Sequence, residues 1–398
     1  MTPALNRVAI SQTVINYDQV DLSDVFSGQS LNVVDVSYSV SAPNTATGNG
    51  LIASVSGGGL NIKNSQTLGG NVTAQTTLNV VVNAGVQTGF TATALGNLSE
   101  LGSPDGGPVS GVVTQIAGPV QVLATASFAG ATAQAGATAL NVQAMANAYQ
   151  LNVADTSGSS TSANTAVTQT SSANTEADGG AVLNSTPGTA GAGANAASND
   201  ITGTGAGVAG QTLTATQTMT GSLTQATQHI NLGDGQTIQS FATATANNLS
   251  LTGENGAVSL VDSQSNIGLT FAQSAATGFQ FGTGQAVSTA IANSVVAGAT
   301  GQQLSLDNTQ SNTGGIVSNA SFNGTSGFDA FSAASATGNA VNGYACSDCG
   351  GVSTIRGSQT NSGGVQANST IDIVGSNRNI NASANATGNS ATFYVSKH

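Results

Sequence analysis

The chain has 398 residues, of which 52 are glycine and only 6% are charged, and its five lysines and arginines are outnumbered by 17 aspartates and glutamates. So few basic side chains exclude a phosphate-neutralising surface, and no nucleic-acid partner is expected. No apolar run is long enough for a transmembrane helix, and abundant valine and threonine argue against disorder. The composition predicts a folded β-protein built mostly from small side chains.

The first 36 residues differ from the rest of the chain. They contain more of the large apolar side chains and four aspartates, Asp18, Asp21, Asp24 and Asp35. An atypical end segment is expected of a repeat protein, so residues 1–36 are predicted to form an N-terminal capping segment. The sequence begins without a secretory leader, which fits either a cytoplasmic protein or an exported one whose leader has been removed. Scarce lysine and many small polar residues favour an exported surface protein.

Residues 37–398 contain two motifs that recur with a period of about 48 residues. The first consists of alternating small residues and ends in asparagine, at Asn49, Asn97, Asn147, Asn247, Asn293, Asn339 and Asn389. A weaker copy, Gly191–Asn195, fills the gap in this series. The second motif is centred on glutamine, at Gln66, Gln115, Gln169, Gln217, Gln264, Gln310 and Gln359. Two independent motifs that keep the same period indicate a structural repeat.

Both motifs alternate with period 2, which predicts β-strands, and signals for helices are nearly absent. Stacking equivalent strands would place asparagine on asparagine and glutamine on glutamine, so that the amides bond along the stack. The sequence therefore predicts an all-β fold, a β-solenoid (parallel β-helix) of seven to eight repeats of about 48 residues. Two turns per repeat would give a rod of about 77 Å. The Ser/Thr/Ala/Gly/Asn-rich residues 155–210 are expected to form a weak or inserted stretch.

Residues that could carry chemistry are sparse. His229 and His398 are the only histidines, and the carboxylates are scattered singly, so no catalytic, cofactor or metal site is predicted and the protein is not expected to be an enzyme. Cys346 and Cys349 form a single CxxC motif, which could be half a zinc site, a redox pair or a structural disulfide. With no second CxxC and no thioredoxin-like pattern, a structural disulfide is favoured, conditional on export.

The Ala-Thr-Gly-Asn and Ser-Gln-Thr-Asn copies, together with Tyr344–Gly351 and Asn385–Val395, resemble holdfast anchor proteins of the HfaD type. This resemblance implies a non-enzymatic adhesin, secreted and associated with the outer membrane, that attaches an exopolysaccharide, the holdfast, to the cell surface. The implied partners are the exopolysaccharide and other secreted anchor or curli-like subunits. The Gln/Asn periodicity also resembles that of curli-type amyloid subunits, and a homo-oligomer or fibre is among the expected assemblies.

Two other functions are compatible with a β-solenoid. A polysaccharide-degrading enzyme would need clustered carboxylates or basic residues on one face, and five basic residues make this alternative weaker. An ice-binding solenoid would need a flat, regular Thr-x-Thr column, and the sequence follows no strict column of this kind. The anchor hypothesis accounts for the repetition, the small side chains and the low charge together.

Overall fold

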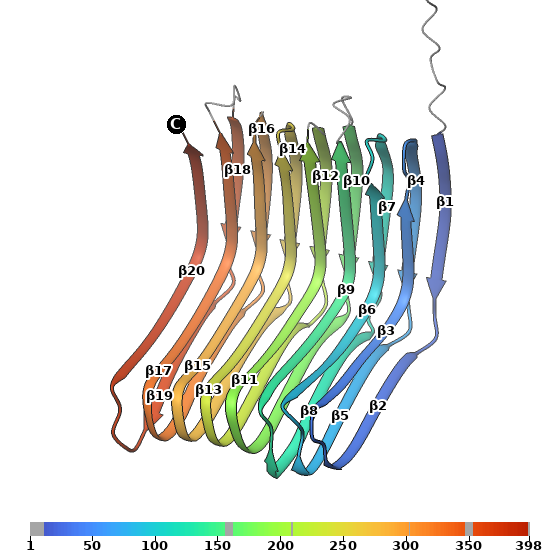
Figure 1. Ribbon diagram of the computed structural model, residues 1–398. Helices are drawn as coiled ribbons and strands as arrows, with labels where there is room; N and C mark the ends of the chain where they lie inside the picture. Colours follow the sequence, from blue (N-terminus) through green and yellow to red (C-terminus); the bar gives the residue numbers. More distant parts are fainter. Residues whose placement is uncertain (1–11, 156–161, 208–209, 302, 347–352, 397–398) are drawn as a thin grey trace, which may run out of the picture.

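The computed structural model describes residues 12–155, 162–207, 210–301, 303–346 and 353–396. These residues form twenty β-strands and no helix, wound into eight successive turns of parallel strands (Figure 1). Each turn begins with one strand of an eight-stranded sheet: β1 (Gln12–Asp21), β4 (Gly59–Leu68), β7 (Val109–Ala117), β10 (Ser162–Ser171), β12 (Gly210–Met219), β14 (Val258–Asn266), β16 (Leu304–Asn312) and β18 (Ser353–Asn361).

The rest of each turn belongs to a twelve-stranded sheet. In the first three turns and the last it is divided into two strands, β2 (Val25–Asp35) and β3 (Ser39–Ser54), β5 (Val72–Asn83) and β6 (Gln87–Ser103), β8 (Gln121–Gln134) and β9 (Ala137–Asp155), and β19 (Val365–Ile373) and β20 (Asn379–Ser396). In the four turns between, it is one long strand, β11 (Asn174–Gly207), β13 (Leu223–Glu254), β15 (Leu269–Thr300) or β17 (Ile316–Cys346).

The predicted all-β solenoid is confirmed, but the number of turns per repeat is wrong. Asn247 pairs with Asn293, and Asn293 pairs with Asn339, so neighbouring strands are one whole repeat apart. Each repeat is therefore one turn, and the eight turns span about 38 Å at the usual strand spacing of about 4.8 Å. A turn needs this many residues because it runs out along two arms and back again.

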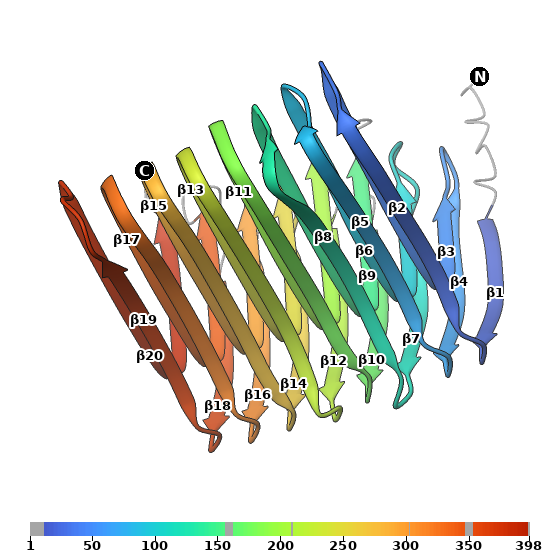
Figure 2. The ribbon, with the colours of Figure 1, turned by 90° about the horizontal axis from the view of Figure 1, so that it is seen from below.

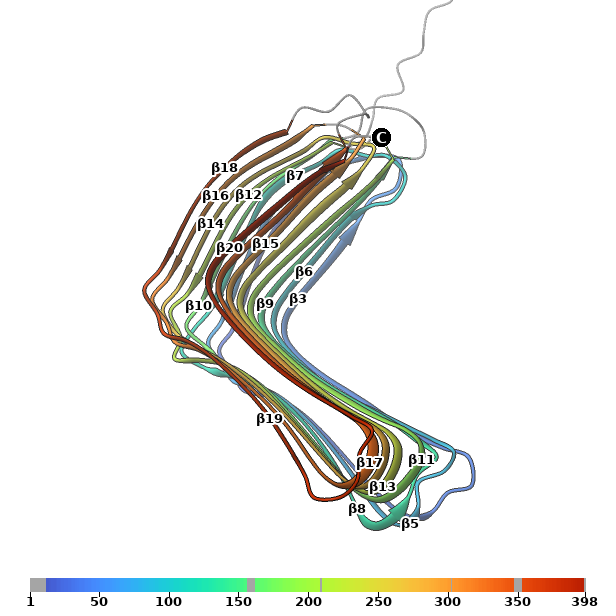
Figure 3. The ribbon, with the colours of Figure 1, turned by 90° about the vertical axis from the view of Figure 1, so that its left-hand side faces the viewer.

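Viewed along its axis, the solenoid has a bent cross-section with two arms (Figure 3). In the first arm, the eight-stranded sheet packs against the later part of the twelve-stranded sheet, around buried residues that include Leu60, Ile62 and Tyr149. In the second arm, the two halves of the twelve-stranded sheet pack against each other, around a separate core that includes Phe90 and Phe128. These two rings meet edge to face with their centroids 5.4 Å apart.

Alternation along the strands accounts for the thinness of both arms. In β13, for example, residues of alternating burial run through almost the whole strand, and most of the inward positions hold alanine, serine, threonine or amide side chains. Small inward residues allow two sheets to approach closely, while the β-branched outward residues favour extended backbone. The repeat therefore builds a narrow core that only stacking against neighbouring turns can bury.

Residues 162–207 form β10 and β11, which pair in register with the turns on both sides. Residues 12–35 form β1 and β2 of the first turn, whose inward side chains are half-buried rather than buried. Figure 2 shows that β1 and β2 lie at one end of the stack and that β19 and β20 lie at the other. Each end turn has a neighbouring turn on one side only.

Candidate functional site

The asparagines of the first motif lie in one column at the corner between the arms. Each side chain donates a hydrogen bond from Nδ2 to Oδ1 of the asparagine in the following turn, at 2.7–2.8 Å. The same Nδ2 also donates to a backbone carbonyl of the eight-stranded sheet, as Asn247 does to Ser265 at 2.8 Å. The column contains Asn49, Asn97, Asn147, Asn199, Asn247, Asn293, Asn339 and Asn389.

The fourth position of this asparagine ladder was not recognised in the sequence. It is Asn199, whereas Asn195, the end of the weaker copy, pairs with Gln143 and Thr243. The two asparagines are four residues apart, so both satisfy a period of 2 and the alternation cannot separate them. The spacing cannot separate them either, because Asn195 lies 48 residues after Asn147 and Asn199 lies 48 residues before Asn247.

The glutamines of the second motif form a parallel column beside the asparagines. Each donates from Nε2 to Oε1 of the glutamine in the preceding turn, at 2.7–2.9 Å, and also to a carbonyl of the facing strand, at 2.8–3.0 Å. Gln19 extends the column into the first turn, within the predicted capping segment. The column contains Gln19, Gln66, Gln115, Gln169, Gln217, Gln264, Gln310 and Gln359.

The two ladders have opposite directions. Asparagine amides donate towards the C-terminal turns, and glutamine amides donate towards the N-terminal turns. Because both amide hydrogens of an inner position are used and its side chain is buried, these amides have no free donor to offer a ligand. They instead fasten the eight-stranded sheet to the facing strands, and so hold the angle between the arms.

Two further polar groups occupy the core near the C-terminal end. Asn266, Asn312 and Asn361 form a short third ladder in the last three turns, with Nδ2 to Oδ1 distances of 2.8 and 2.7 Å. Asp262 is buried beside Asn308, which donates to its Oδ2 at 2.9 Å, while its Oδ1 has no hydrogen-bond partner. Burial raises the pKa of Asp262 to about 8, so the carboxyl is largely protonated at neutral pH.

The structure describes one of the two cysteines and one of the two histidines. Cys346 ends β17, but Cys349 lies outside the described residues, so their disulfide stays a prediction. His229 is exposed on β13, and His398 also lies outside the described part of the chain. Within the described ranges, no three His, Cys, Asp or Glu side chains are grouped so that they could hold a metal ion.

The outward face of the eight-stranded sheet bears hydroxyl groups on both sides of the glutamine ladder. Thr168 and Thr170 flank the glutamine in β10, and serine or threonine occupies the equivalent positions in most other turns. Ile116 interrupts the column in β7, and Asp18 and Val20 replace both hydroxyls in β1. The face is therefore a mixed serine and threonine surface without a strict threonine column.

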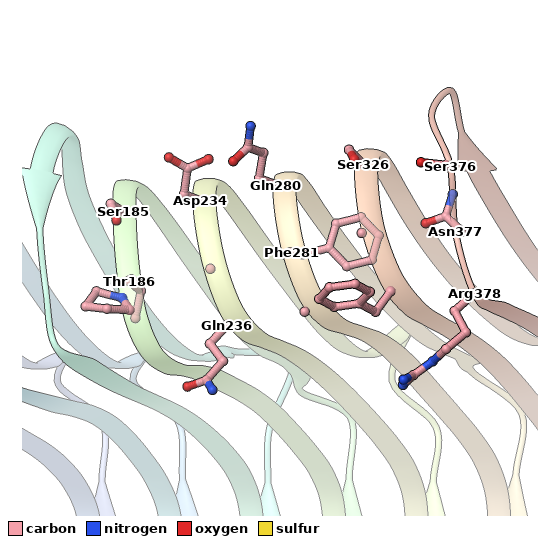
Figure 4. A pocket seen from close by; sticks show the side chains of 15 residues that line it. Ser185, Thr186, Asp234, Gln236, Gln280, Phe281, Ser326, Ser376, Asn377 and Arg378 are labelled. Atoms are coloured by element: carbon pink, nitrogen blue, oxygen red, sulfur yellow. The ribbon is translucent and has the colours of Figure 1, made fainter.

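A groove of about 1000 Å³ lies at the tip of the second arm (Figure 4). It crosses the turns from β11 to the β19–β20 connection, where the chain reverses direction. Ser185, Asp234, Gln280 and Ser326 occupy equivalent positions in successive turns and form a polar row along it. We call this hollow the tip groove; its other lining side chains include Thr186, Pro187, Gln236, Phe281, Phe328, Ser376, Asn377 and Arg378.

The C-terminal part of the tip groove combines an aromatic ring with a fixed charge pair. Phe328 is 63% exposed, and the guanidinium of Arg378 lies 5.8 Å from the centre of its ring. Arg378 forms an ion pair with Asp329, and its Nε donates to Oδ1 at 3.1 Å. Hydrogen bonds from Arg378 and Asn379 hold the pKa of Asp329 below its usual value. The guanidinium is thus anchored on one side and available on the other.

The floor of the tip groove is apolar and closely packed. Phe281 is nearly buried and meets Phe322 edge to face at 4.9 Å. Gly327 makes room for it, because a Cβ atom there would lie 2.3 Å from the Phe281 ring. An exposed ring, an anchored guanidinium, and amides and hydroxyls spaced one turn apart can bind a polyhydroxylated chain laid along the solenoid axis, since sugar rings offer apolar faces and hydroxyl groups together.

A family model described as holdfast attachment protein D, HfaD, matches residues 34–315. The chain belongs to the HfaD family. No curated protein and no solved structure matches it. Family membership links the protein to holdfast attachment and to the cell surface. The C-terminal segments that resembled this family, Tyr344–Gly351 and Asn385–Val395, lie beyond the matched residues. Among the described residues, no helix is long and apolar enough to cross a membrane.

Proposed function

We propose that this HfaD family member is a non-enzymatic adhesin that holds the holdfast exopolysaccharide at the outer surface of the cell, with other secreted anchor subunits. Membership of the HfaD family supports the link to holdfast attachment. The tip groove is the observation that carries the proposal, because it brings an exposed aromatic ring, an anchored guanidinium and a row of amides and hydroxyls together on one ridge.

The polymer would lie across the turns, parallel to the solenoid axis. Equivalent positions repeat about every 4.8 Å in this direction and hold polar side chains in four successive turns, so successive sugar units meet polar groups and many weak contacts act together. The charges of the tip groove favour neutral or amino sugars, because Arg378 is already paired with Asp329 and Asp234 adds an exposed carboxylate. The chain's net charge of −12 likewise opposes capture of an acidic polymer.

Replacing Phe328 tests the proposal. Phe328→Ala removes the exposed ring but no buried contact, and we expect binding to purified holdfast polysaccharide to weaken about tenfold, which corresponds to about 1.4 kcal/mol. Phe241→Ala is the matched control, because Phe241 is partly exposed on β13 outside the tip groove. Binding can be measured by co-sedimentation with the polymer.

Three results would contradict the proposal. Unchanged binding of the Phe328→Ala protein would place the polymer elsewhere, and equal losses in both variants would remove the special role of the tip groove. Release of soluble sugar fragments by the purified wild-type protein would replace the adhesin with a polysaccharide-degrading enzyme.

A further inference from the structure

The two ends of the solenoid have the properties of surfaces that bind each other. Inward side chains of inner turns are almost completely buried, whereas Val25, Leu31 and Val33 in the first turn and Ile371 and Ile373 in the last are only half-buried. Inward residues direct their backbone N–H groups to the following turn, as Val25 does to Asn71 at 2.8 Å. In the last described turn, the same groups point out of the end.

From these features we infer that the last turn of one chain stacks on the first turn of a second copy, in the register that the turns keep within the chain. Extending that register by one turn places Val25 of the second copy on Val365, Leu31 on Ile371 and Val33 on Ile373. Apolar side chains would meet apolar side chains in three of the five inward columns of these strands, and each would become buried.

The amide ladders make the two ends complementary. Because asparagines donate forwards and glutamines backwards, the C-terminal end presents an Asn389 amide donor and a Gln359 acceptor oxygen. The N-terminal end presents the reverse, an Asn49 acceptor oxygen and a Gln19 donor. Stacking head to tail brings each donor to an acceptor, whereas two identical ends in the same columns would bring donor to donor.

Charge also distinguishes the ends. The first turn carries four aspartates, and the last carries Arg356 and Arg378 with a single carboxylate, Asp372. In the extended register, Arg356 lies opposite Asn16 of the second copy and diagonal to Asp18, on the outward face of both strands. A long arginine side chain spans such a diagonal. Attraction between these faces therefore favours the same head-to-tail order.

Pro43 limits the backbone hydrogen bonding that is possible at the N-terminal end of the solenoid. It lies at an outward position of β3, and outward residues direct their N–H groups to the preceding turn, as Gly69 does to Asp21 at 2.6 Å. Proline has no such donor, so the junction would lack one backbone hydrogen bond. Proline on an edge strand hinders pairing by unrelated strands, so the junction depends on matching side chains rather than on backbone bonding alone.

Two charged variants and their mixture test the inference. Ile371→Lys blocks the C-terminal end, and Leu31→Asp blocks the N-terminal end, at positions that are half-buried and contact a neighbour on one side only. By sedimentation velocity and electron microscopy, we expect the wild-type chain to form rods that lengthen with concentration, and each variant alone to remain short.

Mixing the two variants should restore rods, because a lysine end then meets an aspartate end and an unchanged end meets an unchanged end. Thr370→Lys is the matched control, since it adds the same charge at the adjacent outward position and should still assemble. Circular dichroism establishes that each variant is folded. A monomeric wild type, assembly of the single variants, or failure of the folded mixture to assemble would overturn the inference. The Phe328→Ala protein should still form rods, so assembly and sugar binding are separable.

Discussion

The inner turns and the end turns are built from the same repeat but differ in how many of its hydrogen-bonding groups have partners. Gln217 and Asn247 are buried and bonded to the turns on both sides, whereas Gln359 and Asn389 are bonded to one neighbouring turn only. The difference shows that the repeat encodes contacts between turns rather than the stability of one turn. The stability that a repeat contributes therefore depends on its position in the stack. The outer edges of the end turns have unused hydrogen-bonding groups that can bind a partner.

The largest expected effect comes from removing a ladder amide in an inner turn. Asn247→Ala removes one of the two acceptors of the Asn199 amide. It also removes the Asn247 donor from Oδ1 of Asn293 and from the carbonyl of Ser265. Each buried polar group that loses its partner costs about 1–3 kcal/mol, so we expect a loss of about 3 kcal/mol or more.

Asn389→Ala removes the equivalent amide at the C-terminal end, where water can replace the lost contacts. We expect a loss of less than about 1 kcal/mol for this variant. Urea denaturation followed by circular dichroism measures both. Similar losses in the two variants would show that the end turns are as fully satisfied as the inner ones.

The buried carboxyl of Asp262 should give an effect that depends on pH. The pKa of Asp262 is raised in the folded protein, so between pH 4 and about pH 8 the unfolded chain binds fewer protons than the folded chain. The free energy of unfolding should therefore fall as the pH rises through this range. The shift is large enough for a change of a few kcal/mol, at about 1.4 kcal/mol per unit.

Asp262→Asn should reduce this pH dependence and stabilise the protein at pH 8, because an amide beside Asn308 remains neutral. Part of the dependence should remain, since burial also raises the pKa of Asp200. Asp307→Asn is the matched control, because Asp307 is exposed and precedes Asn308 in β16. This variant should leave the dependence of stability on pH unchanged. Thermal unfolding at pH 5, 6, 7 and 8 gives the comparison. A wild-type stability that rises between pH 5 and pH 8 would show that other groups dominate.

The smallest effect concerns packing beneath the tip groove. Gly327→Ala would place a methyl group against the Phe281 ring, and overpacking of this kind costs about 1–3 kcal/mol, with the lower part expected because the ring lies close to the surface. Gly364→Ala, in the last turn, meets no atom within 4 Å and should be nearly neutral. The midpoints of thermal unfolding measure both effects. If both variants unfold at the wild-type midpoint, the Phe281 ring has room for the added methyl group and is not closely packed.

The stacking of turns could be predicted because identical amides recur at one period. The number of turns per repeat could not be predicted. The period gives the number of residues between equivalent positions but not the path that the chain takes around the two arms. Asp262 was within reach of sequence reasoning, because it precedes Gln264 by two residues and must face inward with it. The tip groove was not, since Ser185, Asp234 and Gln280 share a position without sharing a residue type or a motif.

The opposing directions of the two amide ladders bear on how such a protein changes in length. In a single column of aligned amides, every added turn would increase the dipole along the axis and with it the potential at the ends. Here the two long ladders contribute one amide in each direction per turn, and the two contributions largely cancel; only the short ladder of Asn266, Asn312 and Asn361 adds to one direction. Duplication or loss of a turn that carries only the two long ladders therefore leaves the amide dipole along the axis nearly unchanged, so the number of turns can vary without redesign of the corner.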